Sequence, residues 1–390
     1  MDYDFDAVHD RKNTNSLKHD GCRRYGRPDG LLPLWVADMD FKVPPEVEEA
    51  LVKCARHGIF GYSDTFSDGY WDALSDWYSY GFGYNPKREW LVKAPGIVFA
   101  IAVAVRAYTD EGDAVMIQRP VYHPFSEVVN TNNRKLVNNP LVYEDGGYVV
   151  DFEDFERKIA DNGVKLFILC SPHNPVGRVW TREELEKMGD ICLKYNCLVV
   201  SDEIHSDFVF APHKHSVFSM VKPVFAEKSI ICTAPSKTFN LPGLQISNIF
   251  IPDAGLRLRF TKEYTRSGYS QLNAMGLVAC EAAYRYGRQW LTQLLEYLSG
   301  NMKLVYEFGE RTGVKPMPLE GTYLAWLDFS PLGLSHKELD DLVINKAGLW
   351  LSGGTTFGPE GDGFQRVNIA CPRSVLERAL GQLESAIRGA

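Results

Sequence analysis

The chain has 390 residues, of which 45% are hydrophobic, and it carries a formal net charge of −8 at pH 7. A chain of this length is expected to bury a large core and to form more than one domain. The net negative charge, without any cluster of lysine and arginine, argues against a protein that binds nucleic acid.

The N-terminal sequence MDYDFD is acidic and lacks the basic and then apolar layout of a signal peptide. The longest apolar run, 97–105, ends at Arg106 and is far shorter than the roughly 20 residues that a membrane span requires. These features predict a soluble, cytoplasmic protein with no membrane partner.

Eight cysteines are present and none forms a Cys-x-x-Cys pair, so we expect buried thiols and not disulfide bonds. His213 and His215 flank a lysine, but no third metal ligand lies nearby in the sequence. We therefore expect a solvated loop at this position and no metal site.

The stretch up to about Pro44 shows no strong periodicity, and we expect it to pack against the C-terminal part of the chain. Beyond it, short apolar runs alternate with helical patterns. The runs are rich in Val, Ile and Leu and nearly continuous, as expected for strands covered on both faces. The predicted strands are 90–93, 114–118, 164–170, 197–201, 229–233 and 245–251.

A helix is predicted between two of these strands, from Thr181 to about Tyr195. Thr181 and Glu184 form a capping box, and Leu185 and Met188 share one apolar face of the helix. The alternation of strands and helices predicts an α/β fold, with a mostly parallel, doubly wound sheet in a large domain that spans 45–280.

The last hundred residues follow a different pattern, which predicts a smaller α+β domain built from 1–44 and 281–390. For two of its helices, capping residues in the sequence indicate where the helix begins. The predicted elements are a helical stretch at 271–311, a strand at 323–329, a helix capped by Ser335 and Glu338, a strand at 365–369, and a helix opened by Pro372 with Ser374 and Glu377.

Four candidate site residues follow predicted strands of the large domain. Lys237, Asn174, Asp202 and Gly96 each stand at or shortly after the carboxyl end of such a strand. In an open parallel sheet, ligands bind outside the carboxyl ends of the strands. We therefore expect these four residues to meet at one rim of the sheet.

Lys237 lies between a hydroxyl residue and a turn broken by glycine and proline. This setting suits a Schiff-base lysine that binds an aldehyde cofactor such as pyridoxal 5′-phosphate (PLP). Asp202 would keep the pyridine nitrogen protonated, and Asn174 would donate its amide to the phenolate oxygen. Taken singly, the three have ordinary alternatives: a loop lysine, a turn cap after a strand, and a turn-forming asparagine before proline.

A phosphate site is predicted where Gly96 opens a helix, since the backbone N–H groups of Ile97 and Val98 would face the phosphate. Ser236 would add a hydroxyl group, and Tyr122 is expected to stack on the ring face of the cofactor. A plain helix start at Gly96 and a core role for Tyr122 are the alternatives.

Arg366 lies in an otherwise apolar predicted strand and therefore needs a partner. We expect it to bind a substrate carboxylate through two hydrogen bonds, with Asn174 also near the substrate; an internal salt bridge is the alternative. The glycine-rich stretch 353–363 either moves over the site or forms a surface loop.

These residues together resemble the fold-type I PLP enzymes of the aspartate aminotransferase superfamily. Within it, the chain is similar to the lyase branch that includes cystathionine β-lyases of the MalY/PatB kind and cystalysin. The similarity spans essentially the whole chain. The strings that carry it are LWVADMDF at 34–41, TNSLKHD at 14–20, DEIH at 202–205 and SKTFN at 236–240.

The resemblance implies PLP as cofactor, an amino acid as small-molecule substrate, and a homodimer with its sites at the subunit boundary. Tyr62 matches a tyrosine that reaches the phosphate from the partner subunit, and Ala37 would fall near the substrate. His205 stands near the ring oxygen, where typical aminotransferases carry a tyrosine. Gln245 replaces an arginine that many aminotransferases use to bind the phosphate, and His123 replaces a second tyrosine of some relatives.

The resemblance favours a carbon–sulfur β-lyase, which cleaves amino acids such as cystathionine or cysteine by α,β-elimination to pyruvate, ammonia and a thiol. Lys237 would then act as the base at Cα. An aminotransferase is the alternative, because Lys237, Asp202, Asn174 and Arg366 serve both reactions. A non-enzymatic regulatory protein on the same fold is a third reading.

Overall fold

A seven-stranded sheet organises the middle of the chain in the computed structural model, which describes residues 3–144 and 146–389. Its strands run parallel except β10, which is antiparallel to both of its neighbours. The expectation of a mostly parallel sheet is confirmed. Across the sheet the order is β2 (Leu91–Ala94), β10 (Ser247–Phe250), β9 (Ser229–Thr233), β8 (Leu198–Asp202), β7 (Leu166–Cys170), β3 (Ala114–Ile117) and β4 (Lys135–Asn138).

The strands are buried on both faces because their side chains alternate between two apolar cores. In β7, Leu166 and Ile168 pack into one core, whereas Phe167 and Leu169 pack into the other. The first core is covered by α4 (Ile97–Tyr108), α5 (Pro124–Thr131) and α10 (Ala254–Arg266), and the second by α3 (Asp68–Phe82), α6 (Phe152–Asn162), α7 (Arg182–Lys194) and α11 (Ala274–Tyr286).

The remaining elements of this part are short, apart from α2. Helix α2 packs on α11, and a two-stranded hairpin connects β4 to α6. Their bounds are α2 (Pro45–His57), β5 (Leu141–Glu144), β6 (Gly147–Val150), α8 (Phe218–Val221) and α9 (Pro235–Thr238).

Helix α7 begins where its capping box predicts. The Thr181 hydroxyl accepts a hydrogen bond from the backbone N–H of Glu184, and the Glu184 carboxylate accepts one from the N–H of Thr181. The predicted helical stretch at 271–311 is two helices. Gly287 is the C-cap of α11, and α12 (Arg288–Thr312) follows it directly.

A four-stranded antiparallel sheet forms the centre of the C-terminal part. Its order is β11 (Lys315–Pro316), β12 (Leu324–Asp328), β15 (Phe364–Asn368) and β14 (Ser352–Gly353). The predicted Ser335 and Glu338 capping box opens α13 (His336–Asp341). The expected role of Ser374 and Glu377 is wrong: α14 (Arg373–Arg388) has Pro372 at its N-cap, and no side chain caps it.

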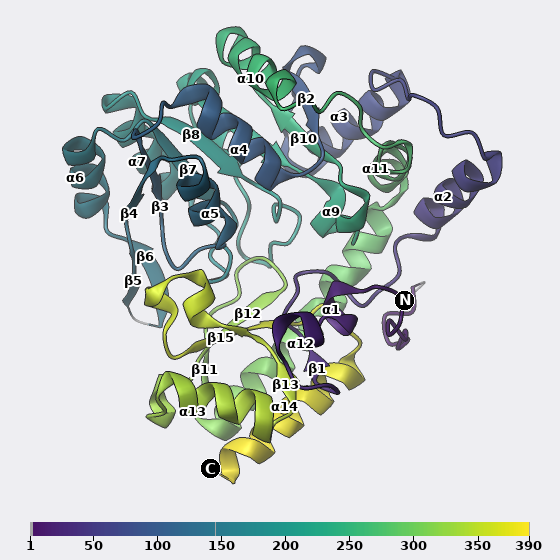
Figure 1. The fold of residues 1–390 in the computed structure, drawn as a ribbon, viewed down its shortest axis with the longest axis vertical. Coiled ribbons are helices and arrows are strands. Elements are labelled where there is room, and N and C mark those ends of the chain that lie inside the picture. The colour runs from purple at the N-terminus through teal and green to yellow at the C-terminus, as the bar shows by residue number, and fades with distance from the viewer. Residues whose placement is uncertain (1–2, 145, 390) are drawn as a thin grey trace.

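The N-terminal segment lies with these C-terminal elements, as Figure 1 shows for α1 (Leu17–Asp20) and β1 (Leu32–Pro33). Strand β1 pairs in parallel with β13 (Leu349–Trp350). The expected packing of the N-terminal stretch is confirmed, and the domain bounds 45–280 and 1–44 with 281–390 stay a prediction. In the described part of the chain, no helix has the length and apolar character of a membrane span.

Candidate active site

A cavity of about 600 Å³ opens at the rim of the large sheet where the parallel strands end. Residues before β10 reach the same rim, because that strand runs in the opposite direction. Every site residue predicted from this chain alone lines the cavity, and so do Gln245 and His123. The predicted residues are Ala37, Gly96, Ile97, Val98, Tyr122, Asn174, Asp202, His205, Ser236, Lys237 and Arg366.

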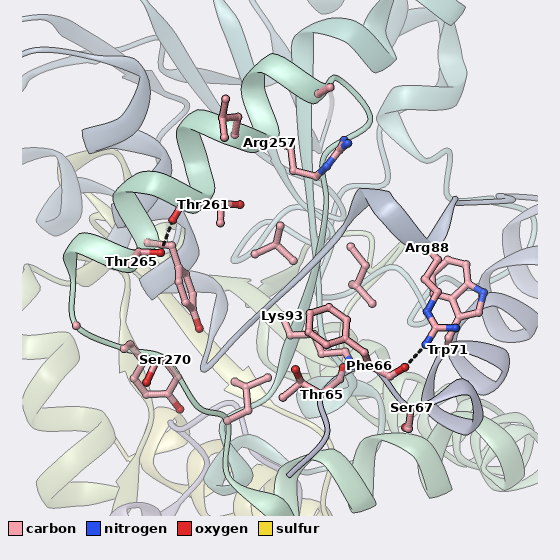
Figure 2. Close-up of a pocket in the computed structure, with 18 residues that line it drawn as sticks. Thr65, Phe66, Ser67, Trp71, Arg88, Lys93, Arg257, Thr261, Thr265 and Ser270 are labelled. Carbon is pink, nitrogen blue, oxygen red and sulfur yellow. Dashed lines mark hydrogen bonds between the residues drawn. The ribbon is translucent and has the colours of Figure 1, made fainter. Parts of the chain in front are cut away.

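A second cavity of about 660 Å³ lies elsewhere and contains none of these residues. Figure 2 shows Phe66 and Trp71 on one side of it, and Arg257, Thr261 and Thr265 of α10 on the other. The described residues that line it include no Asp, Glu, His or Cys, so we place the chemistry in the first cavity. Among the residues described, no three His, Cys, Asp or Glu side chains are grouped to hold a metal ion.

Lys237 lies in the short helix α9, directly after β9. Its Nζ donates a hydrogen bond to the carbonyl oxygen of Ala37, 2.6 Å away. Burial lowers the pKa of Lys237 to about 8, and the nearby positive charge of Arg366 acts in the same direction. Because a neutral amine is the nucleophilic form, this shift suits covalent chemistry near neutral pH.

Asp202 is the last residue of β8, and its carboxylate is buried in the cavity wall. Burial raises its pKa to about 7, although a hydrogen bond from the backbone N–H of Ile204 (3.1 Å) and the charge of Lys237 oppose the shift. A cation held against this carboxylate would lower the pKa again. The site is therefore suited to a ligand with a protonated ring nitrogen.

Arg366 is buried in β15 and is held by three acceptors. It donates to Asn174 Oδ1 (2.9 Å), to the Trp35 carbonyl oxygen (2.8 Å) and to Ser352 Oγ (3.2 Å), and its guanidinium lies 4.7 Å from the centre of the Phe357 ring. None of the described carboxylates forms an ion pair with it, so the internal salt bridge is not found, and its Nε lacks a partner.

The predicted phosphate end of the cavity is the start of α4. Gly96 is the N-cap, no side chain caps the first turn, and a Cβ at Gly96 would point into open space. The backbone at Gly96 is extended, so its geometry does not itself require glycine. The first N–H groups of a helix lack partners within it, so those of Ile97 and Val98 suit an anion. Ser236 and Gln245 line the same cavity.

Two further aromatic side chains, His205 and Tyr122, line the cavity. His205 is buried and packs against Tyr323 with ring centres 5.9 Å apart; burial lowers its pKa well below the usual value, and its Nδ1 has no partner in the described chain. Tyr122 is tied to the site by a 3.1 Å backbone hydrogen bond to Asn174. Burial raises the pKa of Tyr122, so its hydroxyl stays protonated.

Two backbone carbonyls of segment 34–41 accept hydrogen bonds from the cations of the site. The Ala37 oxygen accepts from Lys237 and also from the Tyr323 hydroxyl (2.9 Å), and the Trp35 oxygen accepts from Arg366. This segment therefore positions both groups on which the proposed chemistry depends.

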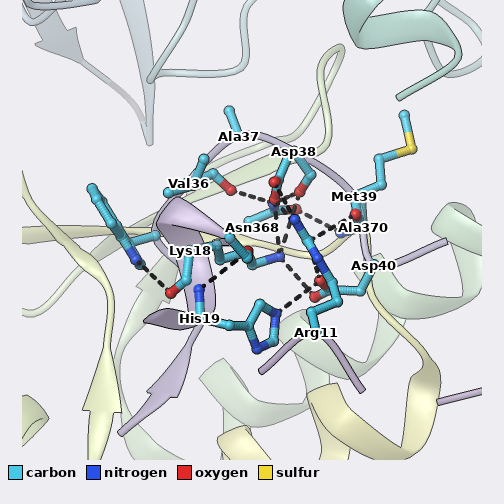
Figure 3. A network of polar contacts seen from close by, with 12 residues as sticks. Arg11, Lys18, His19, Val36, Ala37, Asp38, Met39, Asp40, Asn368 and Ala370 are labelled. Atoms are coloured by element: carbon cyan, nitrogen blue, oxygen red, sulfur yellow. Dashed lines mark hydrogen bonds and ion pairs between the residues drawn. The ribbon is translucent and has the colours of Figure 1, made fainter. Parts of the chain in front are cut away.

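Two asparagine side chains from outside this segment hold it in place, and Figure 3 shows one of them, Asn368. Asn368 donates to the carbonyl oxygens of Val36 (2.7 Å) and Asp38 (2.6 Å). Asn240, which follows α9, accepts from the N–H of Met39 (2.9 Å) and donates to its carbonyl oxygen (3.0 Å). The segment is thus fixed to both the lysine loop and the arginine strand.

The carboxylates of the same segment are fully engaged by N-terminal cations (Figure 3). Arg11 pairs with Asp38 and Asp40, each at 2.6 Å, and the buried Lys18 lies 2.7 Å from Asp40. Burial opposes ionisation of Asp40, but Lys18, His19 and Arg11 hold its pKa well below the usual range. Because Asp38 and Asp40 are paired with these cations, the two carboxylates stabilise the segment and are not free for catalysis.

The sequence pattern has no signal for the carbonyls of Trp35 and Ala37, because every residue carries one. Asn368 was detectable, because it is a polar residue two positions after Arg366 and therefore on the same face of the strand. Asn240 and Tyr323 carry no such signal, since their partners are distant in sequence.

Two sequence expectations need correction or completion. The solvated loop predicted around His215 is wrong for that residue: its side chain is 1% exposed, and its Nε2 lies 2.9 Å from a Glu203 oxygen. The glycine-rich stretch 353–363 lines the cavity in part and is packed, since a Cβ at Gly354 would lie 1.8 Å from the Gly361 oxygen.

Tyr62 is the one predicted site residue that lies outside the cavity of its own chain. Its side chain is 93% exposed, in the connection between α2 and α3. This position is what a residue directed at another subunit requires, and its role stays a prediction.

Comparisons with known proteins agree with this geometry. The family model for aminotransferase class I and II matches residues 29–383. The chain is 44% identical over 385 residues to cystathionine beta-lyase PatB of Bacillus subtilis, covering 98% of this chain and 99% of that protein. It is 34% identical to protein MalY of Escherichia coli, covering 99% of each.

A crystal structure of cystalysin from Treponema denticola, which contains a pyridoxal 5′-phosphate cofactor, superposes with a TM-score of 0.96. The two proteins are 37% identical, and the match covers all of both chains. Because the family model spans most of the sequence, this chain belongs to the aminotransferase class I and II family.

Proposed function

We propose that this protein is a PLP-dependent carbon–sulfur β-lyase, which releases pyruvate, ammonia and a thiol from amino acids that carry sulfur at Cβ. The full-length similarity to a protein named cystathionine beta-lyase carries the choice of reaction. The side chains of the cavity support the cofactor but serve transamination equally well, so they do not decide between the two reactions.

The cavity fits PLP on its own features. The open space beside Gly96 and the uncapped first turn of α4 suit the phosphate, with the Ser236 hydroxyl beside them. Asp202 suits the protonated ring nitrogen, and the Lys237 amine suits the aldehyde. When bound, PLP accepts the electron pair left at Cα after its proton is removed.

The chain's own residues then hold the substrate and move its proton. Arg366, fixed by three acceptors, binds the α-carboxylate through its remaining N–H donors, one of which is the unpartnered Nε. Lys237 takes the Cα proton at its Nζ, and its lowered pKa favours the neutral amine that this step requires. The Ala37 carbonyl gives that nitrogen a fixed position between proton transfers.

The test is a product assay on purified protein supplied with PLP. We expect pyruvate from L-cystathionine, L-cystine or L-cysteine, and a loss of at least about a hundredfold in kcat for Lys237→Ala. The same variant should lose the absorption band of a lysine-bound cofactor. Turnover of 2-oxo acids with an amino donor, without pyruvate from any of the three, would instead identify an aminotransferase.

We also propose that the protein is a homodimer in which Tyr62 of a second copy completes each site. The connection between α2 and α3 exposes Ile59, Phe60, Tyr62 and Phe66, and Phe66 also lines the second cavity (Figure 2). Several large, exposed side chains of this kind within one short connection favour an interface. Light scattering should give twice the chain mass of 44.0 kDa, and a monomer would contradict the proposal.

A further inference from the structure

Part of the cavity wall consists of aromatic rings that the proposed chemistry does not use. Trp35 and Trp350 stack with ring centres 4.2 Å apart and planes 11° apart. Tyr25 meets both rings edge-on, at 5.2 and 5.8 Å. The parallel pairing of β1 with β13, continued by a hydrogen bond from Leu34 N to the Trp350 oxygen, places these rings together. All three rings line the cavity.

This aromatic wall is joined directly to the arginine expected to bind the α-carboxylate. The Trp35 carbonyl oxygen accepts from Arg366, and Ser352, two residues after Trp350, contacts the same guanidinium and the Trp35 oxygen. A substrate held by Arg366 therefore has the wall beside it. Flat apolar rings favour an alkyl or thioether chain laid against them.

Arg27 lines the same cavity, two residues after Tyr25 in the sequence. It is half-buried, and among the residues described its guanidinium has no ion pair and no hydrogen bond. The nearby carboxylate of Asp29 lies 4.0 Å from Arg23 instead. Of the described residues that line the cavity, Asp202 alone carries a carboxylate, and none of them forms an ion pair with Arg27.

We propose that Arg27 and the aromatic wall form a distal subsite, in which Arg27 binds a second carboxylate at the far end of an extended amino-acid substrate. The inference rests on the proposed function and makes it narrower: the preferred substrates carry a carboxylate beyond the sulfur, as cystathionine does. Arginine suits this role because its planar guanidinium binds a carboxylate with two hydrogen bonds.

Steady-state kinetics on the PLP-loaded enzyme test the subsite. Arg27→Ala should lower kcat/KM for L-cystathionine by about tenfold and leave that for S-methyl-L-cysteine, which ends after the sulfur, within about twofold. Arg23→Ala is the matched control: it removes the same charge from a residue outside the cavity, and should change neither value. Equal losses on both substrates, or no loss on cystathionine, would overturn the proposal.

A binding measurement separates this proposal from the lyase assignment. Octanedioate has as many chain atoms between its carboxylates as cystathionine, and octanoate lacks the second carboxylate. Binding of each acid is measured by quenching of tryptophan fluorescence. Arg27→Ala should weaken the binding of octanedioate about tenfold and leave the binding of octanoate nearly unchanged. Unchanged octanedioate affinity would mean that Arg27 is only a surface arginine. An absence of pyruvate from both amino acids would refute the lyase assignment, while this binding comparison still decides the subsite.

Discussion

Asp202 and Lys237 show how burial prepares two side chains for the same ligand. Removal from water disfavours the charged form of each group, so it raises the pKa of Asp202 to about 7 and lowers that of Lys237 to about 8. A cationic ring that pairs with Asp202 and an aldehyde that reacts with Lys237 would both relieve this cost.

Because ionising the buried carboxylate of Asp202 costs free energy, we expect the stability of the protein to depend on pH. Its folded pKa of about 7 lies above the ordinary 3.8, so the free energy of unfolding falls as pH rises from about 4 to 7 and the buried group ionises. In cofactor-free protein, Asp202→Asn should therefore increase the free energy of unfolding by about 2–4 kcal/mol at pH 8 and by little at pH 4.

Urea denaturation at the two pH values measures this difference. The same variant supplied with PLP should lose activity, by about a hundredfold or more, because the ring nitrogen loses its anionic partner. Equal stability of variant and wild type at pH 8 would show that the carboxylate is not strained in the folded protein.

At the scale of residues, chemistry that depends on side-chain type was predictable from the sequence. Lys237, Asp202 and Arg366 all reach one cavity because each follows or lies in a recognisable strand. The backbone acceptors that hold them were not predictable, since carbonyls have no sequence signature. The burial of His215 was also missed, because its partner Glu203 becomes visible only in three dimensions.

Asn368 in β15 is expected to position Lys237, because it holds segment 34–41 in place. Asn368→Ala removes two hydrogen bonds from carbonyls on either side of Ala37, so the free energy of unfolding should fall by about 1–3 kcal/mol. Because the Ala37 oxygen holds Lys237, kcat should fall more than KM rises, and the alkaline-side pH dependence of kcat should shift.

Asn345→Ala is the matched control, since that side chain bonds only to Asp341 on the protein surface. It should leave both stability and kcat nearly unchanged. A stability loss in Asn368→Ala with an unaltered pH profile would mean that Asn368 supports the fold and does not position the lysine.

The glycine-rich loop gives a second prediction at the scale of elements. Gly354 and Gly361 approach so closely that a Cβ on Gly354 would lie 1.8 Å from backbone. Gly354→Ala should therefore lower the free energy of unfolding by about 2–4 kcal/mol, or displace the loop from the cavity wall.

Gly81→Ala offers a comparison within α3, because the new methyl group meets nothing within 4 Å. Helix propensity predicts a gain of about 0.5–1 kcal/mol there. Thermal unfolding of both variants distinguishes the two environments, and a neutral Gly354→Ala would show that the loop adapts freely.

For elements with strong local signals, the predicted first and last residues lie within about two positions of those in the structure. Elements that depend on distant partners were not predicted. The buried strands and the Thr181 capping box depend on neighbouring residues, which the sequence displays. The helix after Pro372 was placed correctly, but Ser374 does not cap it, because Pro372 already occupies the N-cap. The pairing of β1 with β13 joins residues more than 300 positions apart, beyond the reach of any local pattern.

At the scale of the whole molecule, the cavity is assembled from both ends of the chain. Asp202 ends a strand of the large sheet and Lys237 lies in the helix that follows the next strand, whereas the C-terminal sheet supplies Arg366 and the N-terminal segment supplies Ala37. The relative position of Lys237 and Arg366 therefore depends on how Asn240 and Asn368 hold segment 34–41 between them. The exposed Tyr62 suggests that a second chain adds the last contribution.

Subunit complementation tests that contribution directly. In a dimer with one Tyr62→Ala chain and one Lys237→Ala chain, a site that draws Tyr62 from the partner is complete once per dimer. Such a heterodimer, purified through two different tags, should show about half of the wild-type activity, while both parent homodimers stay well below it. A wild-type chain paired with Lys237→Ala is the control and should give the same half. If Tyr62 served its own chain, the mixed dimer would contain no complete site, and its activity would not exceed that of the Tyr62→Ala homodimer.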